Sequence, residues 1–355
     1  MHEQAPSGSA LAGGPSTPAD VLDATAGARG EIPGLLQRAV QELHPGLRRV
    51  SAYHFGWADA QGQPITAASP GKLLRARLTL LCAAAAGAPS RMALAGAVAM
   101  ELVHNYTLLH DDIVDADELR RDRPAAWITF GTPMAIVTGD AIIALALRQL
   151  PMAEPGGRQA LVVLLDSLAG LGDGESAELA LETIASSDVT YDHYAEVAQK
   201  TTALLSACAG VGACLGGADQ MLTAALQSAA VNVGLAWQAA NDVEDIWGDS
   251  RVTGKMSCND LRSGKKTLPV IAALRSGTEA GNRLAMLLDQ GERLGEVQVE
   301  EAVRLVEAAG GRRYAERLSA RYLQTALDTL RGHAMVPAVK EELAQLFNVI
   351  VLRSE

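Results

Sequence analysis

The sequence predicts an all-α protein, and three observations support that prediction. Aromatic residues make up only 4% of the 355 residues, so the aromatic runs that build sheets are scarce. Alanine, leucine, glutamate and arginine, which favour helices, dominate the composition. From Lys72 to about Leu346, apolar residues recur at helical spacing between short breaks at glycine and proline. We therefore expect a single large helical bundle.

The composition favours one folded domain behind a short tail. Hydrophobic residues at 48% and charged residues at 20% are enough for a sizeable core. Of the first thirty residues, 20 are Ala, Gly, Ser, Pro or Thr, so residues 1–30 are expected to be a disordered tail. This tail is either inert or a docking segment for a partner. A helix is expected to begin near Ile32, and residues 31–355 to form the domain, because no linker interrupts them.

Turn and proline signals divide the first half of the chain into helices. Residues 87–90 read as a turn, and Ser90 is placed to cap a helix predicted over 92–115. Pro133 suits the first turn of the next helix. Residues 151–157, with two prolines and two glycines, are expected to end that helix.

Further helices are predicted in the second half. One follows Asp188 and continues through Lys200, another covers 224–247, and Pro269 falls in the first turn of the helix after that. The uncharged stretch 201–218 approaches the length that spans a membrane. Its many small residues indicate a closely packed, buried helix instead, so no transmembrane span is predicted.

The charge and cysteine content exclude several classes of function. The net charge is −11 and no basic run is visible, so nucleic acid is not an expected partner. A few well-placed cations or bound metal ions can still bind a small anionic substrate. No CxxC or Cys/His spacing typical of zinc occurs among the four cysteines, Cys82, Cys208, Cys214 and Cys258. Without a signal-peptide pattern, free thiols and a cytoplasmic location are expected.

The strongest local signal is an acidic cluster late in the predicted helix 92–115. Asp111 and Asp115 are four residues apart, so their carboxylates share a helix face, with Asp112 beside them. Three like charges destabilise a bare helix but suit a hard, oxygen-seeking cation, most naturally Mg²⁺. A solvated acidic helix end is the alternative.

A second acidic cluster, at the end of the predicted helix 224–247, weakens that alternative. It contains Asn241, Asp242 and Asp245 and follows an uncharged segment that includes Gln238. Two such clusters can face one another across a cavity and hold several Mg²⁺ ions around one diphosphate. Cations suited to phosphate oxygens follow the two clusters or lie between them: Arg120, Arg121, Lys200, Lys255 and Lys265.

Taken in order, these motifs resemble the trans-isoprenyl diphosphate synthase family (polyprenyl synthetases) from about Gly71 to Pro269. The matching segments are Gly71-Lys72-Leu73-Leu74-Arg75, Glu101-Leu102-Val103-His104 before Asp111-Asp112-Ile113-Val114-Asp115, Arg120-Arg121, Gly139-Asp140, Gly174-Glu175, Glu178-Leu179, Lys200-Thr201, Gln238 to Asp245, Asp260, and Gly264-Lys265-Lys266-Thr267-Leu268-Pro269. So many ordered matches are specific to the family. The chain looks most like its geranylgeranyl and farnesyl diphosphate synthases.

The resemblance implies a fold, a reaction and an assembly. The fold is a helical bundle of the isoprenoid synthase type with a central apolar cavity. The reaction is the condensation of isopentenyl diphosphate with an allylic diphosphate to a short-chain all-trans prenyl diphosphate, with three Mg²⁺ ions per active site. The assembly is a homodimer, for which the Ala-rich region 81–98 is expected to offer an apolar surface.

Carried over residue by residue, the resemblance implies three sets of site residues. The metal ions would be bound by Asp111, Asp112, Asp115, Asn241, Asp242 and Asp245. Isopentenyl diphosphate would be bound by Lys72, Arg75, His104 and Arg121. The allylic substrate would be bound by Arg120, Lys200, Thr201, Lys255 and Lys265, with Gln238 beside the forming carbocation. The expected catalytic residues are Asp111, Asp115, Arg120, Lys200, Gln238 and Asp242.

Asn241 stands where the family has an aspartate, and it suggests a rival function. Class I terpene cyclases carry Asn, then Ser or Thr four residues on, then Glu eight on; Asn241, Asp245 and Asp249 have that spacing. A cyclase acting on a prenyl diphosphate is therefore one alternative, and an inactive or regulatory homologue is another. A cyclase has no use for an isopentenyl site, yet all four residues of that site are present.

Tyr106 is the candidate residue for setting product length. Side chains four or five residues before Asp111 lie about one turn deeper along the wall that a growing chain follows. Tyr106 is bulky, whereas Thr107 and the deeper Val103 are modest in size. Because the family uses aromatic residues near here as a tunnel floor, a single aromatic at the deeper position favours geranylgeranyl diphosphate as product. The alternative is that Tyr106 is core packing and another helix forms the floor.

Overall fold

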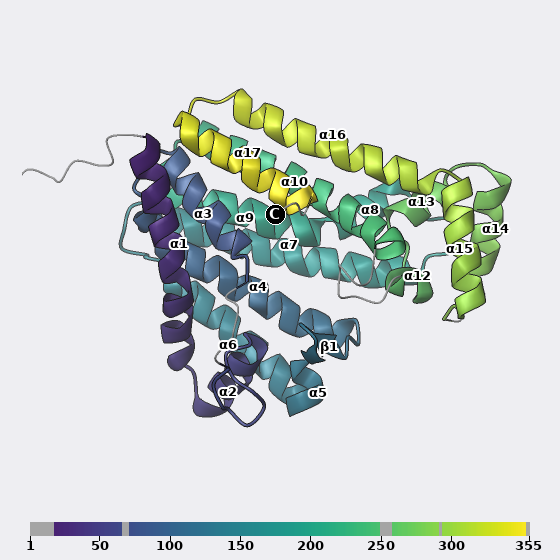
Figure 1. Ribbon diagram of the computed structural model, residues 1–355, viewed down its shortest axis with the longest axis horizontal. Coiled ribbons are helices and arrows are strands. Elements are labelled where there is room, and N and C mark those ends of the chain that lie inside the picture. The colour runs from purple at the N-terminus through teal and green to yellow at the C-terminus, as the bar shows by residue number, and fades with distance from the viewer. Residues whose placement is uncertain (1–17, 66–70, 249–257, 291–292, 353–355) are drawn as a thin grey trace, which may run out of the picture.

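The computed structural model of the protein describes residues 18–65, 71–248, 258–290 and 293–352. Helices make up nearly all the regular structure of these residues, which confirms the all-α prediction (Figure 1). A short hairpin pairs β1 (Leu119–Arg120) with β2 (Arg123–Pro124) in antiparallel register.

The helices follow one another with short connections. The first group is α1 (Pro18–Gln41), α2 (Pro45–His54), α3 (Leu74–Ala85), the 3₁₀ turn η1 (Ser90–Ala93), α4 (Leu94–Val114), α5 (Ala126–Phe130) and α6 (Thr132–Gln149). The central group is α7 (Gly157–Thr183), α8 (Tyr191–Val197), α9 (Gln199–Leu215) and α10 (Gln220–Trp247). The last group is α12 (Asn259–Arg262), α13 (Leu268–Leu274), α14 (Glu279–Leu288), α15 (Glu296–Ala308), α16 (Gly311–Arg331) and α17 (Pro337–Leu352).

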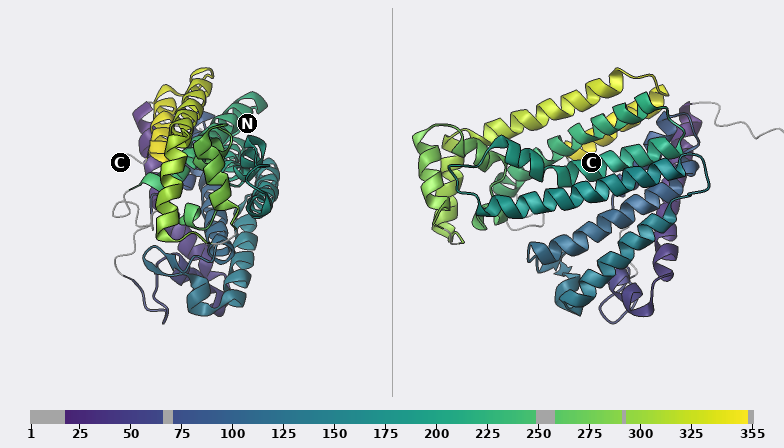
Figure 2. Two further views of the ribbon diagram at one scale, coloured as in Figure 1. Left: turned by 90° about the vertical axis from the view of Figure 1, so that its right-hand side faces the viewer. Right: turned by 180° about the vertical axis from the view of Figure 1, so that it is seen from behind.

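Long helices packed side by side form the centre of the bundle. α10 packs against α9 and α16, and α9 packs in turn against α7 and α3. α4 packs against α6, and this pair diverges from the central helices, as the two faces of the molecule show (Figures 1 and 2). α1 and the α14–α15 pair lie at opposite ends of the molecule (Figure 1).

The small residues of segment 201–218 form a buried helix, as predicted. A Cβ on Gly212 of α9 would lie 2.1 Å from the Thr79 carbonyl oxygen, and one on Gly216, just after α9, would lie 2.7 Å from the Ala83 Cα. Larger side chains would push α3 and α9 apart, so these glycines determine how closely the two helices pack. Gly212 meets Thr79, and four residues later Gly216 meets Ala83, which is also four residues further along. The two helices α3 and α9 therefore run parallel.

The N-terminal helix begins earlier than the sequence predicted. α1 starts at Pro18 instead of near Ile32, so residues 18–30 are helical and not a disordered tail. Ala28 and Ile32 are buried against the bundle, and the Thr25 hydroxyl lies 2.6 Å from that of Ser90. This contact also explains why Ser90 does not cap α4: its hydroxyl bonds to α1. Residues 1–17, where the docking hypothesis now falls, lie outside the described residues.

Most other predicted boundaries are confirmed, and one helix is divided. α6 carries Pro133 in its first turn, α10 covers the predicted helix 224–247, and α13 carries Pro269 in its first turn. The helix expected from Asp188 through Lys200 is two helices, α8 and α9, which part at Ala198. α8 begins at Tyr191 because the Thr190 side chain accepts a hydrogen bond from the His193 backbone N–H.

The apolar helices next to the site belong to the interior of the molecule. Among the described residues, one segment, Ser90–Val114, is long and apolar enough to span a membrane, but its Leu102, Val103 and Leu109 side chains are fully buried in the bundle. Region 81–98 was expected to offer a dimer surface, and this was wrong, because its apolar side chains are largely buried within the monomer. Most of these side chains belong to α3 and α4, which pack against each other and against α9.

Candidate active site

Three helices and one loop meet at the first acidic cluster: the end of α4, the later part of α7 with Glu175 and Glu178, the start of α9, and the loop before α13. Asp111 lies in the last turn of α4, and the backbone N–H of Asp115 donates to its carbonyl oxygen, which keeps both residues on the helix end. Lys200, near the start of α9, places its Nζ 2.6 Å from Glu175, 3.0 Å from Glu178 and 3.8 Å from Asp111.

Lys265, in the loop before α13, completes this network. Its Nζ lies 2.7 Å from Asp115 and 3.0 Å from Glu178. Glu178 therefore bridges the two lysines, with Asp115 on one side and Asp111 on the other. The structure brings together two predicted metal-binding residues and two predicted phosphate-binding residues.

The network carries more negative than positive charge. Four carboxylates share two ammonium groups: those of Asp111, Asp115, Glu175 and Glu178 against Lys200 and Lys265. Burial raises the pKa of Asp111 to about 7, and the neighbouring carboxylates oppose Lys200, which lowers it. Burial lowers the pKa of Lys200, but the surrounding carboxylates raise it overall. The site therefore favours additional positive charge.

A hard divalent cation fits this donor set. The available ligands are carboxylate oxygens, which Mg²⁺ prefers. Within the described ranges, no group of three or more Asp, Glu, His or Cys side chains is close enough to hold a metal ion by itself. Mg²⁺ usually combines one or two carboxylates with waters and substrate phosphates, so the arrangement suits an ion that binds together with a diphosphate.

Asp112 is separated from Asp111 and Asp115, although the sequence placed it beside them. It is 1% exposed and lies on a different face of α4. Its Oδ1 accepts a hydrogen bond from Arg120 Nε at 2.7 Å, and Arg120 also lies 4.0 Å from Asp117. Asp112 and the β1–β2 hairpin thereby hold the guanidinium of Arg120 in place.

The second acidic cluster is organised around a partly buried hydrogen-bond chain. Thr201 Oγ1 donates to Gln238 Oε1 at 2.8 Å, and Gln238 Nε2 donates to Asp242 Oδ1 at 2.9 Å. The other oxygen of Asp242 accepts the backbone N–H of Leu268 at 3.0 Å. Burial raises the pKa of Asp242 to about 7, although the bonds from Leu268 and Gln238 lower it. Lys200 contacts the first acidic cluster, and the next residue, Thr201, is linked to the second through Gln238. The start of α9 therefore lies beside both clusters.

Asn241 and Asp245 lie one helical turn apart on α10. Both are partly exposed, in contrast to Asp242. Asp245 accepts a hydrogen bond from the backbone N–H of Asp260 at 3.3 Å, which ties α10 to α12. Asp249 and Lys255, which the sequence analysis included, lie outside the described residues.

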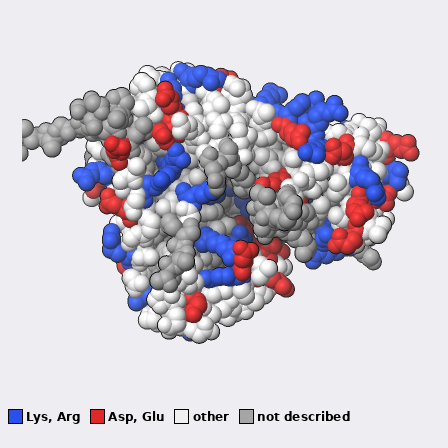
Figure 3. Space-filling view, in the orientation of Figure 1, with Lys and Arg blue, Asp and Glu red and all other residues white. Residues whose placement is uncertain are grey.

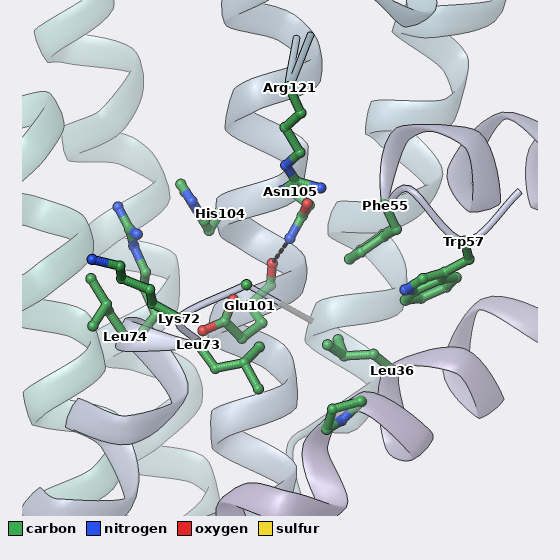
Figure 4. A pocket seen from close by; sticks show the side chains of 13 residues that line it. Leu36, Phe55, Trp57, Lys72, Leu73, Leu74, Glu101, His104, Asn105 and Arg121 are labelled. Carbon is green, nitrogen blue, oxygen red and sulfur yellow. Dashed lines mark hydrogen bonds between the residues drawn. The ribbon is translucent and has the colours of Figure 1, made fainter. Parts of the chain in front are cut away.

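A separate cavity of about 280 Å³ opens beside α4 (Figure 4). Lys72, Arg75, His104 and Arg121 all line it, so the structure gathers the four residues expected to bind isopentenyl diphosphate. Figure 4 shows Lys72 and His104 on one side, with Phe55 and Trp57 on the other. Basic side chains also gather around a hollow in the middle of this face, despite the net charge of −11 (Figure 3).

Buried polar groups lie among the cations of this cavity. The carboxylate of Glu101 accepts the backbone N–H of Ala76 at 2.9 Å, and burial raises its pKa. Burial, together with Arg75 and Arg121, lowers the pKa of His104 well below its usual value. This shift favours the neutral imidazole of His104, which offers one ring N–H as a donor. Arg121 is anchored by a 3.3 Å hydrogen bond from its guanidinium to the His54 carbonyl.

The aromatic wall of the cavity was not predicted from the sequence. Phe55 and Trp57 stack with ring centroids 4.4 Å apart. Their spacing, two aromatic residues separated by one in a chain with few aromatics, was the available signal. It could not show that the end of α2 lies across the cavity from Lys72 and Arg75.

Tyr106 is a residue of α4, about one turn from Asp111. Its ring meets that of His110 edge to face, with centroids 4.8 Å apart, and His110 Nε2 lies 3.2 Å from the Ile136 carbonyl oxygen. Burial raises the pKa of Tyr106, with a further increase from Asp140 and Asp111. The side chain is half-buried, whereas Val103, deeper in α4, is fully buried.

Comparison with known proteins identifies what the chain resembles. Residues 62–306 match the family model described as polyprenyl synthetase. The chain is 38% identical to the (2E,6E)-farnesyl diphosphate synthase of Mycobacterium tuberculosis, over 90% of this chain and 89% of that protein. It is 39% identical to the geranylgeranyl diphosphate synthase of the same organism, over 89% of this chain and 90% of that one.

The fold agrees with these matches. A polyprenyl synthetase from Streptomyces coelicolor A3(2) superposes with a TM-score of 0.85 at 36% identity, covering 93% of this chain and 99% of that chain. Since the two mycobacterial relatives differ in product but are equally similar to this chain, identity alone does not decide the product length.

Proposed function

The chain belongs to the polyprenyl synthetase family, and from this premise we propose that it condenses isopentenyl diphosphate with an allylic diphosphate to a short-chain all-trans prenyl diphosphate. The reaction depends on Mg²⁺, with three ions per site as the resemblance implies. We also propose that the enzyme works in the cytoplasm, in keeping with its four free, buried thiols.

One observation carries this proposal: two separate groups of charged side chains, each suited to a diphosphate, adjoin α4. The first is the acid and lysine network around Asp111 and Lys200, which suits a diphosphate bound together with metal ions. The second is the cavity lined by Lys72, Arg75 and Arg121, whose cations suit a diphosphate directly. A terpene cyclase needs only the first site, so the second favours condensation of two substrates.

The first site prepares the allylic substrate for ionisation. Lys200, Lys265 and Arg120 would bind the allylic diphosphate and stabilise the charge that develops on it as the C–O bond breaks. Asp111 and Asp115 on one wall, and Asn241 and Asp245 on the other, would hold Mg²⁺, which would supply further positive charge at the leaving group.

The chain then directs the new carbon–carbon bond. The carbonyl oxygen of Gln238, fixed by Thr201, would face the allylic cation and stabilise it. The cations of the second site hold isopentenyl diphosphate so that its double bond can attack. The proton lost from the adduct passes to the released diphosphate, which Lys200 and Lys265 retain.

An incorporation assay tests the proposed function. Labelled isopentenyl diphosphate is incubated with Mg²⁺ and dimethylallyl, geranyl or farnesyl diphosphate, and the products are separated by chain length. We expect label in a prenyl diphosphate only when both substrates are present. A hydrocarbon or terpene alcohol formed without isopentenyl diphosphate would establish the cyclase, and no turnover with any allylic partner would establish an inactive homologue.

The product proposed is geranylgeranyl diphosphate. The support is Tyr106, the half-buried aromatic of α4 that lies about one turn from Asp111 and contacts His110. Its ring would block the path of a chain that grows away from Asp111. Chains longer than twenty carbons would have to displace it.

The assembly proposed is a homodimer, formed through α6 instead of region 81–98. Large apolar side chains on α6 are exposed: Met134 by 39%, Ile136 by 42% and Val137 by 52%. Neighbouring residues of one helix with this much exposed apolar surface are typical of a protein interface. A second copy of the chain would cover them.

A further inference from the structure

Each acidic motif contains one aspartate that is turned inward. Asp112 and Asp242 are both 1% exposed, whereas Asp111 and Asp245 are only partly buried. Each inward aspartate binds a polar side chain that the proposed function uses: Asp112 binds Arg120, and Asp242 binds Gln238. In each motif, therefore, one carboxylate faces the interior of the protein and another is partly exposed to solvent.

We infer that Asp242 is a positioning residue for Gln238 and for the start of α13, and not a ligand of the metal ions. The inference rests on the proposed function, because the orientation of Gln238 matters only if an allylic cation forms beside it. It assigns to Asp242 a role different from the metal binding that the sequence resemblance implies.

The hydrogen-bond chain fixes which end of the Gln238 amide faces the substrate. Both oxygens of Asp242 act as acceptors, one for the Leu268 backbone N–H and the other for the Gln238 NH₂ group at 2.9 Å, so Gln238 turns its NH₂ group toward Asp242. Its carbonyl oxygen must then face Thr201, which donates to it at 2.8 Å. A carbonyl oxygen stabilises a neighbouring cation, whereas an NH₂ group in its place would oppose one.

The second oxygen of Asp242 holds the loop that carries Lys265. Leu268, the first residue of α13, donates its backbone N–H to Asp242 Oδ2 at 3.0 Å. Lys265 lies three residues earlier and reaches Asp115 and Glu178. One buried carboxylate thus sets the position of a substrate-facing amide on α10 and of a phosphate-binding lysine in the adjacent loop.

The surroundings of Asp242 do not suit a metal ligand. Both oxygens already accept hydrogen bonds, and the residue is 1% exposed. Mg²⁺ keeps several waters of hydration when it binds to proteins, and this needs open space at the ligand. Asn241 and Asp245, which are partly exposed, are better placed for that role.

The variant Asp242→Asn distinguishes a positioning role of this residue from a metal-binding role. The introduced amide would turn its NH₂ toward Gln238, because its oxygen is needed for Leu268, and the Gln238 amide would have to turn over. We expect kcat at pH 8 to fall about 100-fold, the scale of one misplaced electrostatic group, with less than a twofold change in the half-saturating Mg²⁺ concentration. The matched control is Asp111→Asn, for which that concentration should rise about tenfold or more. A similar rise in Asp242→Asn would overturn the inference.

A second substitution should rescue the first. In the double variant Gln238→Glu with Asp242→Asn, the new carboxylate accepts hydrogen bonds from Thr201 and from the introduced amide, so an oxygen again faces the substrate. We expect kcat to recover about tenfold over Asp242→Asn, whereas Gln238→Glu alone places two carboxylates in contact and loses activity. A merely structural role of Asp242 predicts no such recovery, and its absence would contradict the inference.

A crystal structure of the wild-type protein with Mg²⁺ and inorganic diphosphate gives a readout that is independent of turnover and of variant folding. We expect Asp242 to retain its bonds to Gln238 and Leu268, with Mg²⁺ on Asp111. A Mg²⁺ ion at about 2.1 Å from an Asp242 oxygen would overturn the inference. Failure of the proposed function would appear separately, as wild-type enzyme that forms no condensation product.

Discussion

Asn241 is the residue at which the second acidic motif differs from the family, and it lies on a partly exposed part of α10. An amide oxygen binds a hard cation more weakly than a carboxylate does. We therefore expect Asn241→Asp to keep activity and to lower the half-saturating Mg²⁺ concentration. Asn241→Leu, which removes the oxygen, should cost about 100-fold in kcat, since a lost metal contact is worth several kcal/mol. Equal steady-state rates for the wild type and Asn241→Leu would place the residue outside the metal site.

Tyr106 provides a second prediction for a single residue. Tyr106→Ala removes the aromatic ring from this part of α4 and should lengthen the product by whole five-carbon units, as measured by chromatography of the dephosphorylated alcohols. Tyr106→Phe keeps the ring and is the matched control, with product length unchanged. A folded, active Tyr106→Ala variant that makes the wild-type chain would show that another helix forms the floor.

At the same scale, helical spacing predicted the shared face of Asp111 and Asp115 but not the inward orientation of Asp112. Positions four apart on a helix share a face in any helix, so the first pair followed from spacing alone. Asp112 is rotated about 100° from its neighbour, and its orientation depends on Arg120, which the hairpin places there. Asp242 likewise depends on Gln238 and on Leu268, which is 26 residues away in sequence. Helical periodicity does not predict which residues from elsewhere in the chain will contact a given side chain.

Among the elements, α1 shows how a weakly patterned segment can be helical. In its first half, the face toward the bundle is made of small residues such as Thr25 and Ala28, which are also common in disordered segments. We expect Ala28→Glu to destabilise the protein by about 3 kcal/mol, because it buries a charge. Ala26→Glu, on the exposed side of the same helix, should change the free energy of unfolding by less than about 0.5 kcal/mol. Urea unfolding measures both, and equal values would mean that this part of α1 does not pack on the bundle.

Region 81–98 illustrates the opposite error, at the scale of the element. An apolar, alanine-rich run shows that a surface is covered, but not whether the covering comes from the same chain or from a second copy. Here α9 covers it, because Gly212 and Gly216 allow the close approach of α3. The exposed apolar residues of α6 are mixed with buried ones in the sequence, and only the fold separates the two faces.

For the whole molecule, the proposed dimer predicts a change in mass. Val137→Glu places a charge in the exposed apolar face of α6 and should convert the dimer to a monomer at micromolar concentration, as measured by light scattering. Arg148→Glu, on the same helix but beyond the apolar residues, is the control and should remain dimeric. A monomeric wild-type protein would contradict the proposed assembly.

The central claim concerns the whole bundle: it holds two diphosphate sites, one dependent on metal ions and one not. Isothermal titration of the wild-type protein tests this directly, with isopentenyl diphosphate and a non-ionisable thio analogue of an allylic diphosphate, each with and without Mg²⁺. We predict that isopentenyl diphosphate binds one site per chain without Mg²⁺, through Lys72, Arg75 and Arg121. The allylic analogue should bind tightly only with Mg²⁺, because the carboxylates around Lys200 otherwise repel it. An absolute requirement of isopentenyl diphosphate binding for Mg²⁺, or competition of both ligands for one site, would contradict the account.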